Sequence, residues 1–366
     1  MTPFFSRRMT PLDSPLAVTL LYLGAAGVAV ALGGAMFLFF GANPLSAYGA
    51  LIGNAFFDLR GFGYTLVQAT PLILVSLGTI VAWRSGFIYL GFDGAMVVAA
   101  AASTAVALAA SQSGSPGGLP PFLVIVLALL VGAAVGAVWS TIVALLQVRS
   151  GGNAVLLALM ANYLAILLVQ FLVSGPMRAA GDQPQTALID RAFWLPIALH
   201  GTRAHIGILI ALALAALVFV VMEKTAVGFE LIAAGLNPRA ARYGGVDVGR
   251  RILQAAVIAG GLAGLAGAID ILGVNHRLLD GLSQGTGFIG IVAALLGRLT
   301  VFGAVAASFL YSGLTVGAEV TQRHTGLPSA VIQVVQALIV LCLLGVEILR
   351  THRLALIAPR SSRGAA

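Results

Sequence analysis

Two stretches of this 366-residue chain read alike: GFIGIVAA at residues 287–294 and GFDGAMVV at residues 91–98. Each begins with the pattern Gly-Phe-x-Gly, in which x differs between the two copies, and continues as an apolar helical run. Matching interrupted helices in the two halves of a membrane protein indicate an inverted repeat with a binding site near the bilayer midplane. The alternative is a chance recurrence in a chain with 45 glycines. The spacing argues against it, because the copies fall in the third and eighth predicted spans.

The sequence around these stretches is strongly apolar. Hydrophobic residues make up 60% of the chain, charged residues 9%, and the mean hydropathy is +1.03. About 20 apolar residues are enough to cross the hydrocarbon core of a bilayer. We therefore predict an all-α, polytopic membrane protein with about ten transmembrane helices. The expected spans are residues 16–40, 62–83, 87–110, 119–147, 153–173, 205–222, 252–274, 286–297, 301–320 and 328–349.

The distribution of basic residues sets the expected topology. With the N-terminus inside, 14 of the 20 lysines and arginines fall on the cytoplasmic side, as the positive-inside rule requires. We expect a cytoplasmic N-terminal segment at residues 1–15, a transmembrane domain at 16–349 and a basic cytoplasmic tail at 350–366. The first apolar run is longer than the core of a signal peptide, so we interpret it as a retained helix.

Several classes of function are disfavoured by the sequence. The single lysine, Lys224, follows Glu223 rather than glycine, so the chain lacks the P-loop that binds ATP. The five histidines have no metal-ligand spacing, the one cysteine, Cys342, lies in an apolar run, and no nucleophile–base arrangement is present. We expect no catalysis, no cofactor and no metal. The net charge of +8 follows from the arginines at helix ends and does not indicate nucleic-acid binding.

The loop between the sixth and seventh spans has its own helix signals. Asn237 followed by Pro238 predicts a helix start, because Asn caps well and proline fits the first helical position. Gly244 and Gly245 then end that helix. An upstream helical piece beginning at Phe229 is ended by Gly235. Two short helices of this kind indicate a docking element, and the alternative is an ordinary amphipathic connector.

Within this loop, the stretch AGLNPRAARYGGV at residues 234–246 resembles the coupling-loop motif of ABC importer permeases of the branched-chain amino acid, ribose and nucleoside group. It most resembles the simple-sugar and nucleoside branch. The similarity runs from about residue 45 to 348. Its other motifs are GNAV at 152–155 leading to MANY at 160–163, GLAGLAGA at 261–268 and GTGFIGIVAALLG at 285–297.

The resemblance implies the permease subunit of an ABC importer in the bacterial cell (inner) membrane. Its implied partners are cytoplasmic ATPase subunits that hydrolyse the ATP, an extracytoplasmic solute-binding protein and a second permease, which makes a heterodimer the expected assembly. The coupling residues implied by the motif are Glu230, Gly235, Asn237, Pro238 and Arg239. Of these, Glu230 and Arg239 are the expected polar contacts with the ATPase.

The third span departs from the family pattern. The family reads similarly to Asn-Ile-Gly-Ala-Glu-Gly-Gln where this chain has YLGFDGA at residues 89–95. Ala154 also replaces a position that is commonly acidic. These changes leave the architecture untouched but leave the transported substrate open.

Five residues are candidates for the substrate pathway. Asp93 lies well inside a span, where a charge is expensive and commonly functional; it accepts hydrogen bonds from a solute or caps its own broken helix. Asn162 lines the pathway or forms an interhelical hydrogen bond. Phe92, Phe288 and Tyr163 stack on a base or sugar or serve in packing. Asp93 and Phe92 are expected close to Gly287 and Phe288. Asp270 falls near a span end, in a solvated position.

Two functions remain open from the residues alone. One is the permease of an ABC importer, and the alternative is an ion-coupled secondary transporter or channel for a small solute. A coupled carrier usually needs more than one midplane carboxylate. The scarcity of ionisable residues in the spans favours a neutral polar solute, a nucleoside or simple sugar. An external loop at about 174–204 with Arg178, Arg191 and Arg203 is expected to seat the binding protein.

Overall fold

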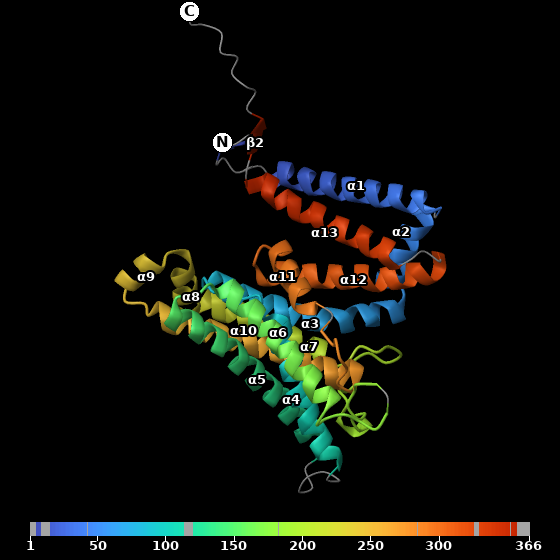
Figure 1. The fold of residues 1–366 in the computed structure, drawn as a ribbon. Helices are drawn as coiled ribbons and strands as arrows, with labels where there is room; N and C mark the ends of the chain where they lie inside the picture. Colours follow the sequence, from blue (N-terminus) through green and yellow to red (C-terminus); the bar gives the residue numbers. More distant parts are fainter. Residues whose placement is uncertain are drawn as a thin grey trace, which may run out of the picture. The chain divides into compact units, whose positions relative to one another are not determined.

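A computed structural model describes residues 5–8, 15–41, 43–112, 120–181, 183–283, 285–325, 329–351 and 353–356 (Figure 1). Regular structure in this part of the chain is almost all helical. The α-helices are α1 (Pro15–Phe39), α2 (Pro44–Ile52), α3 (Leu59–Arg84), α4 (Phe92–Gln112), α5 (Pro121–Ser150), α6 (Ala154–Ser174), α7 (Gly207–Lys224), α8 (Ala226–Leu236), α9 (Pro238–Tyr243), α10 (Val248–Asp270), α11 (Thr286–Leu296), α12 (Val301–Thr325) and α13 (Ser329–Thr351). Short elements are the π-helices η1 (Gly53–Phe57) and η4 (Ile271–Asn275), the 3-10 helix η3 (Arg191–Phe193), and the strands β1 (Phe5–Arg8) and β2 (Arg353–Leu356).

Each predicted span corresponds to one long apolar helix or to the short α11. The bounds agree to within about five residues, with the largest differences at the start of α4 and the end of α12. Among the described residues, seven helices are long and apolar enough to cross a membrane. The eighth span was predicted to be short, and α11 has 11 residues. The all-α polytopic fold is thus confirmed, while the number of crossings stays a prediction.

The chain divides into two compact units. Unit 1 comprises Met1–Asn54 and Gly317–Ala366, and unit 2 comprises Ala55–Val316. The single transmembrane domain expected at 16–349 is therefore distributed over both units. The structure describes only small parts of the expected N-terminal segment and basic tail, and Arg360 and Arg363 lie outside the described residues.

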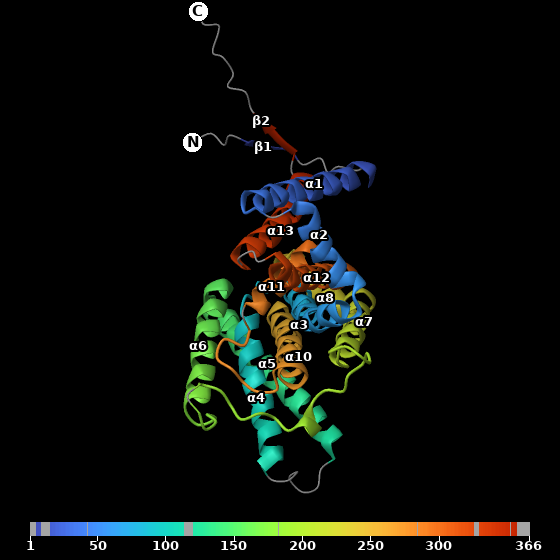
Figure 2. The ribbon, with the colours of Figure 1, turned by 90° about the vertical axis from the view of Figure 1, so that its right-hand side faces the viewer.

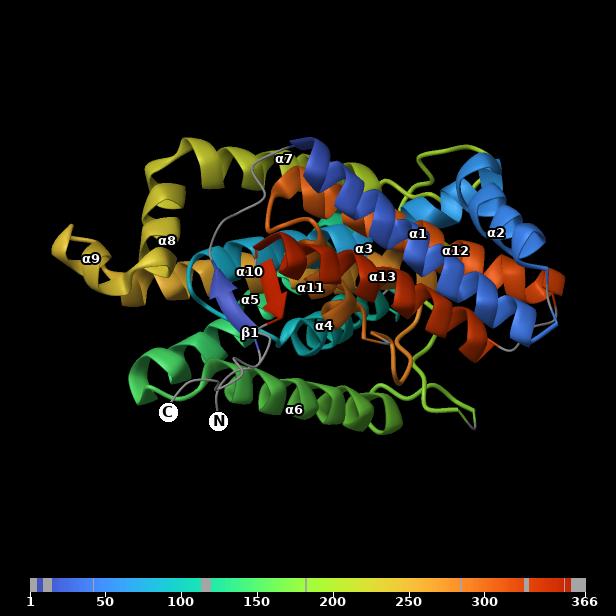
Figure 3. The same cartoon turned by 90° about the horizontal axis from the view of Figure 1, so that it is seen from above.

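Unit 1 contains the paired helices α1 and α13 together with α2 (Figure 3). The Tyr48 hydroxyl on α2 donates to the carbonyl of Val30 on α1 at 2.9 Å, and its ring lies edge-on to Phe37. Beyond these helices β1 pairs antiparallel with β2, with Phe5 opposite Leu356 (Figure 2). Residues 5–8 and 353–356 therefore lie side by side, and no pattern in the sequence predicted this short ladder.

Unit 2 is built around α10, which packs against α3, α4 and α5 (Figure 1). The contact between α5 and α10 depends on small residues, which let helices approach closely in a membrane. A Cβ on Gly264 would lie 2.2 Å from the carbonyl oxygen of Gly132, and a Cβ on Gly136 would lie 2.4 Å from that of Gly260. Ser140 donates its hydroxyl to an α10 carbonyl at 2.6 Å.

The third predicted span does not start as a helix. The chain leaves α3 at Arg84, turns at Gly86 with φ 83°, and runs without helical structure until Phe92. Phe87 and Tyr89 in this stretch are fully buried. Irregular backbone at membrane depth is tolerated where protein surrounds it. The helix is therefore interrupted as predicted, with the break at residues 85–91.

Candidate functional site

The N-terminal ends of α4 and α11 meet at the carboxylate of Asp93. The backbone amide of Gly287 donates to Oδ1 of Asp93 at 2.8 Å, and the amide of Phe288 and the hydroxyl of Ser283 also donate to this carboxylate. Gly287 has to lack a side chain, because a Cβ there would lie 2.5 Å from the amide nitrogen of Asp93. We call this contact the junction. It brings Asp93 to Gly287 and Phe288, as expected from the sequence.

The junction explains how a carboxylate is tolerated inside the protein. Asp93 is 3% exposed, and a buried charge is costly unless it is hydrogen-bonded. It lies in the first turn of α4 and receives the free amides of the first turn of α11. Both helix ends carry partial positive charge, which stabilises an anion. Asp93 therefore caps the opposite broken helix, whereas the sequence suggested a cap for its own.

Asn162 on α6 bonds the backbone on both sides of the point where α4 begins. Its Oδ1 accepts from the amide of Gly94 at 2.7 Å, and its Nδ2 donates to the carbonyl of Leu90 at 3.0 Å. The side chain is buried. The interhelical hydrogen bond that the sequence offered as one alternative is therefore present, and the expected place of Asn162 on the pathway stays a prediction.

The three candidate aromatic residues differ in their exposure. Phe92 is fully buried, and its ring contacts that of Tyr89 at 4.9 Å between centroids. Phe92 therefore packs inside the protein in this conformation, and its expected place on the pathway stays a prediction. Phe288 and Tyr163 are exposed, so both retain surface with which to contact a solute. Their role stays a prediction.

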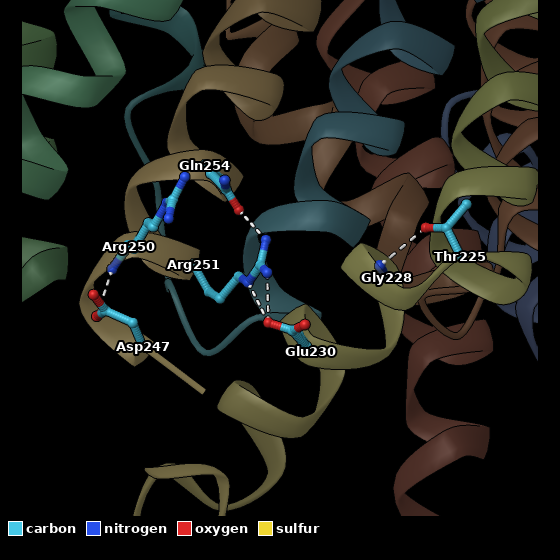
Figure 4. Close-up of polar contacts among 7 residues, drawn as sticks. All are labelled: Thr225, Gly228, Glu230, Asp247, Arg250, Arg251 and Gln254. Carbon is cyan, nitrogen blue, oxygen red and sulfur yellow. Dashed lines mark hydrogen bonds and ion pairs between the residues drawn. The ribbon is translucent and has the colours of Figure 1, made fainter. Parts of the chain in front are cut away.

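The loop between α7 and α10 folds as two short helices, and we call residues 225–245 the coupling loop. Thr225 caps α8, with its Oγ1 accepting from the amide of Gly228 at 3.2 Å (Figure 4). Asn237 caps α9 by accepting from the amides of Arg239 and Ala240, both at 3.1 Å. Pro238 is the first residue of α9. The helix start predicted at Asn237 and Pro238 is confirmed.

Glu230 on α8 is engaged within the chain. Its carboxylate accepts from Nε of Arg251 at 2.8 Å and also from Nη2, while Arg251 donates to Gln254 (Figure 4). At the start of α10, Asp247 accepts from the amide of Arg250. Glu230 therefore fastens α8 to α10 within the chain, and its expected contact with the ATPase stays a prediction. Arg239 is exposed and stays available.

The coupling loop also contacts the turn at residues 84–86, where α3 ends and the non-helical stretch before α4 begins. A Cβ on Gly235 would lie 2.2 Å from the carbonyl oxygen of Arg84, so only glycine allows this approach. The side chain of Arg84 forms an ion pair with Glu223 at 2.6 Å. Sequence reasoning missed this second contact, because the two residues lie 139 positions apart.

A group of large side chains on the coupling loop points away from the protein. Phe229 is 72% exposed, Leu236 82% and Tyr243 96%. Exposed arginines, Arg239 and Arg242, lie on the same segment. Exposed aromatic and apolar residues beside arginine are typical of protein interfaces. α8 and α9 lie at one end of unit 2, and residues 175–206 lie at the other (Figures 1 and 3).

The described residues of the loop at 175–206 form a cap on unit 2. Thr186 and Leu278 are joined by two hydrogen bonds, and the amide of Ile189 donates to the carbonyl of His276 at 2.8 Å. The ring of His276 stacks on Trp194 with centroids 3.6 Å apart. These contacts tie the loop to the end of η4, so its surface is preorganised.

The three arginines of this loop are exposed and held in place. Arg178 donates to the carbonyl of Gly181, and Arg191 lies over the ring of Trp194. Arg203 lies over the ring of Tyr64.

Asp270 differs from its expected position. The π-helix η4 continues α10 as far as Asn275, so Asp270 lies within the apolar helix and accepts from Asn275 Nδ2 at 2.9 Å. The sequence placed Asp270 in a solvated position near the end of the span predicted at 252–274, and it did not mark Asn275 as its hydrogen-bond donor.

Known proteins share this sequence over most of its length. A family profile described as the permease component of branched-chain amino acid transport systems matches residues 61–344. The guanosine ABC transporter permease protein NupP of Bacillus subtilis is 32% identical, with 92% of this chain and 93% of that protein aligned. The glucose ABC transporter permease protein TsgB13 of Haloferax volcanii is 30% identical over 92% of this chain and 90% of its own. The nucleoside ABC transporter permease protein NupB of Lactococcus lactis is 30% identical, with 84% and 86% aligned. No solved structure matched the chain.

The chain belongs to this family of transport permeases. It is a multi-pass protein of the cell membrane and the translocation component of an ABC importer. It is not an enzyme, since ATP hydrolysis lies with separate ATPase subunits. The family implies ATPase and solute-binding partners. The alternative of an ion-coupled transporter or channel acting alone is thereby set aside.

Proposed function

We propose that this permease imports a neutral polar solute, either a nucleoside or a simple sugar. The observation that carries the proposal is the junction: the carboxylate of Asp93 is already hydrogen-bonded to amides of α11. A charged solute needs an opposite charge in a dry pathway, and Asp93 does not offer a free one. The relatives named for guanosine, nucleoside and glucose transport support the same class of solute.

We further propose that the pathway passes beside the junction. Phe288 and Tyr163 offer exposed aromatic surface that suits a base or sugar face. Asp93 and Asn162 hold the two broken helix ends in position, and Phe92 packs behind them. Opening the pathway then requires α4 and α11 to separate or rotate at the junction.

The coupling loop is proposed to dock on the ATPase. Its exposed Phe229, Leu236 and Tyr243 provide apolar anchors, and Arg239 provides charge. Gly235, Asn237 and Pro238 shape the loop, while Glu230 keeps α8 against α10. A solute-binding protein docks at the opposite end of unit 2, on residues 175–206. The second permease is proposed to be a different chain, so that the pair is a heterodimer.

The test is uptake by proteoliposomes containing the permease pair, its ATPase and its binding protein. Labelled guanosine, uridine, ribose, glucose and leucine are supplied outside, with ATP or a non-hydrolysable analogue inside. We expect ATP-dependent uptake of a nucleoside or a sugar and none of leucine. Uptake of leucine alone, or uptake that is equal with the analogue, would overturn the proposal.

A further inference from the structure

We propose that the buried rings of Phe87, Tyr89 and Phe92 form a rigid link that transmits movement of the coupling loop to the junction. This inference rests on the function proposed above and assigns a positioning role to residues 85–92. The link begins where Gly235 contacts the turn after α3 and ends at Asp93. All of its residues belong to unit 2.

The first step is a direct contact between two backbones. A Cβ on Gly86 would lie 3.1 Å from Cα of Gly235, and Gly86 adopts a φ of 83° that disfavours other residues. Because neither glycine has a side chain, no flexible group separates the end of α8 from this turn. The ion pair between Arg84 and Glu223 fastens the same turn to the end of α7. Displacement of α8 therefore displaces residues 84–86 with it.

The second step is the row of rings that follows the turn. Phe87 and Tyr89 stack with centroids 5.2 Å apart and 18° between their planes. Tyr89 then meets Phe92 edge-on at 4.9 Å. The Tyr89 hydroxyl donates to the carbonyl of Gly91 at 2.8 Å, and Trp83 Nε1 donates to the carbonyl of Tyr89. All three rings are fully buried.

These rings supply stiffness that the backbone lacks. Residues 87–91 have no helical structure, so without packed side chains the segment would bend and absorb a displacement. Close-packed interiors transmit strain because they are not freely deformable. The three packed rings therefore stiffen this non-helical segment, so that it moves as one body.

The last step joins this stiffened segment to α11, the second broken helix. Phe92 is the first residue of α4, and Asp93 follows it directly. The Asp93 carboxylate holds the amide of Gly287 at 2.8 Å. A shift of Phe92 therefore changes the contact between α4 and α11. The C-terminal end of α8 and the junction are therefore joined by an unbroken series of packed or bonded groups.

Tyr89 is the residue to vary, because it contacts both other rings. Tyr89→Leu removes the stack and the hydrogen bond, whereas Tyr89→Phe keeps the rings and removes only the hydroxyl. Phe309 provides a matched control: it also contacts two rings, those of Phe56 and Phe62, but lies outside the link. Each variant is assembled with the ATPase and binding protein in proteoliposomes. Complex yield, ATP hydrolysis and uptake are measured on the same samples.

We expect Tyr89→Leu to assemble and hydrolyse ATP, while uptake per ATP hydrolysed falls about tenfold. Tyr89→Phe and Phe309→Leu should keep the wild-type ratio. A Tyr89→Leu variant whose uptake and hydrolysis fall in equal proportion, or stay unchanged, would overturn the link. Where Tyr89→Leu fails to assemble, the same ratio is measured for Phe87→Leu, which keeps the Tyr89–Phe92 contact. A wild-type complex that neither hydrolyses ATP nor imports solute would contradict the proposed function instead.

Discussion

Asp93 connects two helices that are separated by 194 positions in the sequence. A capping side chain usually accepts from amides of its own helix. Here the free amides of α11 are satisfied from α4, so the two broken helices share one carboxylate. The side chain thereby becomes a contact that has to rearrange whenever the two helix ends move apart.

Asp93→Asn tests whether the charge at the junction matters. Asparagine keeps one acceptor oxygen but presents its amide group to the donors of α11. We expect the free energy of unfolding to fall by about 2 kcal/mol, assembly to persist and uptake to be impaired. Thermal unfolding of the purified complex and proteoliposome uptake measure these two effects. If Asp93→Asn takes up solute like wild type while Asp93→Leu fails to assemble, Asp93 serves only as a helix cap and its charge has no role in transport.

Some of these residue roles were accessible from the sequence and some were not. Asp93 and Asn162 attract attention because polar groups inside a span are costly. Their partners are backbone groups of distant segments, and no residue-type signal marks those. Gly287 was visible only through the repeat that aligns it with Gly91. Tyr89 has no sequence signal, because its role depends on packing.

His205 lies two residues before α7 and is buried. Its Nδ1 accepts from the amide of Gly207 at 3.2 Å, and its Nε2 has no hydrogen-bond partner among the described residues. Burial, and to a smaller extent the nearby His276, lowers the pKa of His205 to about 4. The imidazole is thus neutral at physiological pH, with its proton on Nε2.

This lowered pKa predicts acid sensitivity of unfolding. Between pH 6.5 and 4 the unfolded chain binds a proton at residue 205 that the folded chain does not. Stability therefore falls as the pH falls through this window, by up to about 3 kcal/mol. His205→Asn keeps an acceptor for Gly207 and should lose less melting temperature between pH 7.5 and 5 than the wild type. His200, which is exposed, provides the control: His200→Asn should follow the wild type. Equal losses in all three proteins would refute the assignment.

At the scale of elements, α8 is held by two kinds of contact. Gly235 packs on the turn after α3, and Glu230 pairs with Arg251 at the start of α10. The first contact limits the distance of α8 from the turn. The second limits its rotation, because two nitrogens of the Arg251 guanidinium donate to one carboxylate oxygen of Glu230.

Removing the Glu230–Arg251 pair should loosen the coupling loop. The pair is partly exposed, so Arg251→Leu should cost only about 1 kcal/mol of stability. The larger expected effect is functional: ATPase activity stimulated by the loaded binding protein should decrease, because α8 no longer keeps its orientation. The double variant Glu230→Arg with Arg251→Glu should recover part of it. Failure of the reversed pair to recover any stimulation would mean that the ion pair itself is not the cause.

The α5–α10 contact offers a matched pair of glycine substitutions. Gly264→Ala places a methyl group 2.2 Å from the carbonyl oxygen of Gly132, whereas Gly261→Ala meets its nearest atom at 3.7 Å. We expect Gly264→Ala to cost about 1–3 kcal/mol, with a lower yield and melting temperature in detergent. Gly261→Ala should behave as wild type. Equal melting temperatures for the two variants would show that the helices separate more easily than their packing suggests.

Element bounds were predictable where hydrophobicity and caps agree. Asn237 with Pro238 predicted the start of α9, and the span predicted from residue 153 agrees with α6, which Asn153 caps. The start of α4 was placed five residues early, because the buried stretch from Phe87 to Gly91 is apolar but not helical. Hydropathy reports burial in the membrane and does not distinguish helix from extended chain.

At the scale of unit 2, its two ends carry different basic surfaces. Arg239 and Arg242 belong to the coupling loop, and Arg178, Arg191 and Arg203 belong to the cap at residues 175–206 (Figures 1 and 3). The positive-inside bias already separated these two groups in the sequence. It did not predict that the cap arginines would be held by intramolecular contacts, since stacking on Trp194 or Tyr64 depends on tertiary structure.

Reversing the cap arginines should weaken docking of the binding protein selectively. Charges at the rim of an interface mainly steer association and set its salt dependence. The triple variant Arg178→Glu, Arg191→Glu and Arg203→Glu should therefore slow association about tenfold at low salt, with little difference from wild type at high salt. Ligand affinity of the isolated binding protein should not change. The control is Arg239→Glu with Arg242→Glu at the opposite end, which should leave this association intact and reduce stimulated ATP hydrolysis. If the triple variant binds the solute-binding protein like wild type at low salt, the cap is not its docking surface. A change of six charge units on a docking surface should slow association under these conditions.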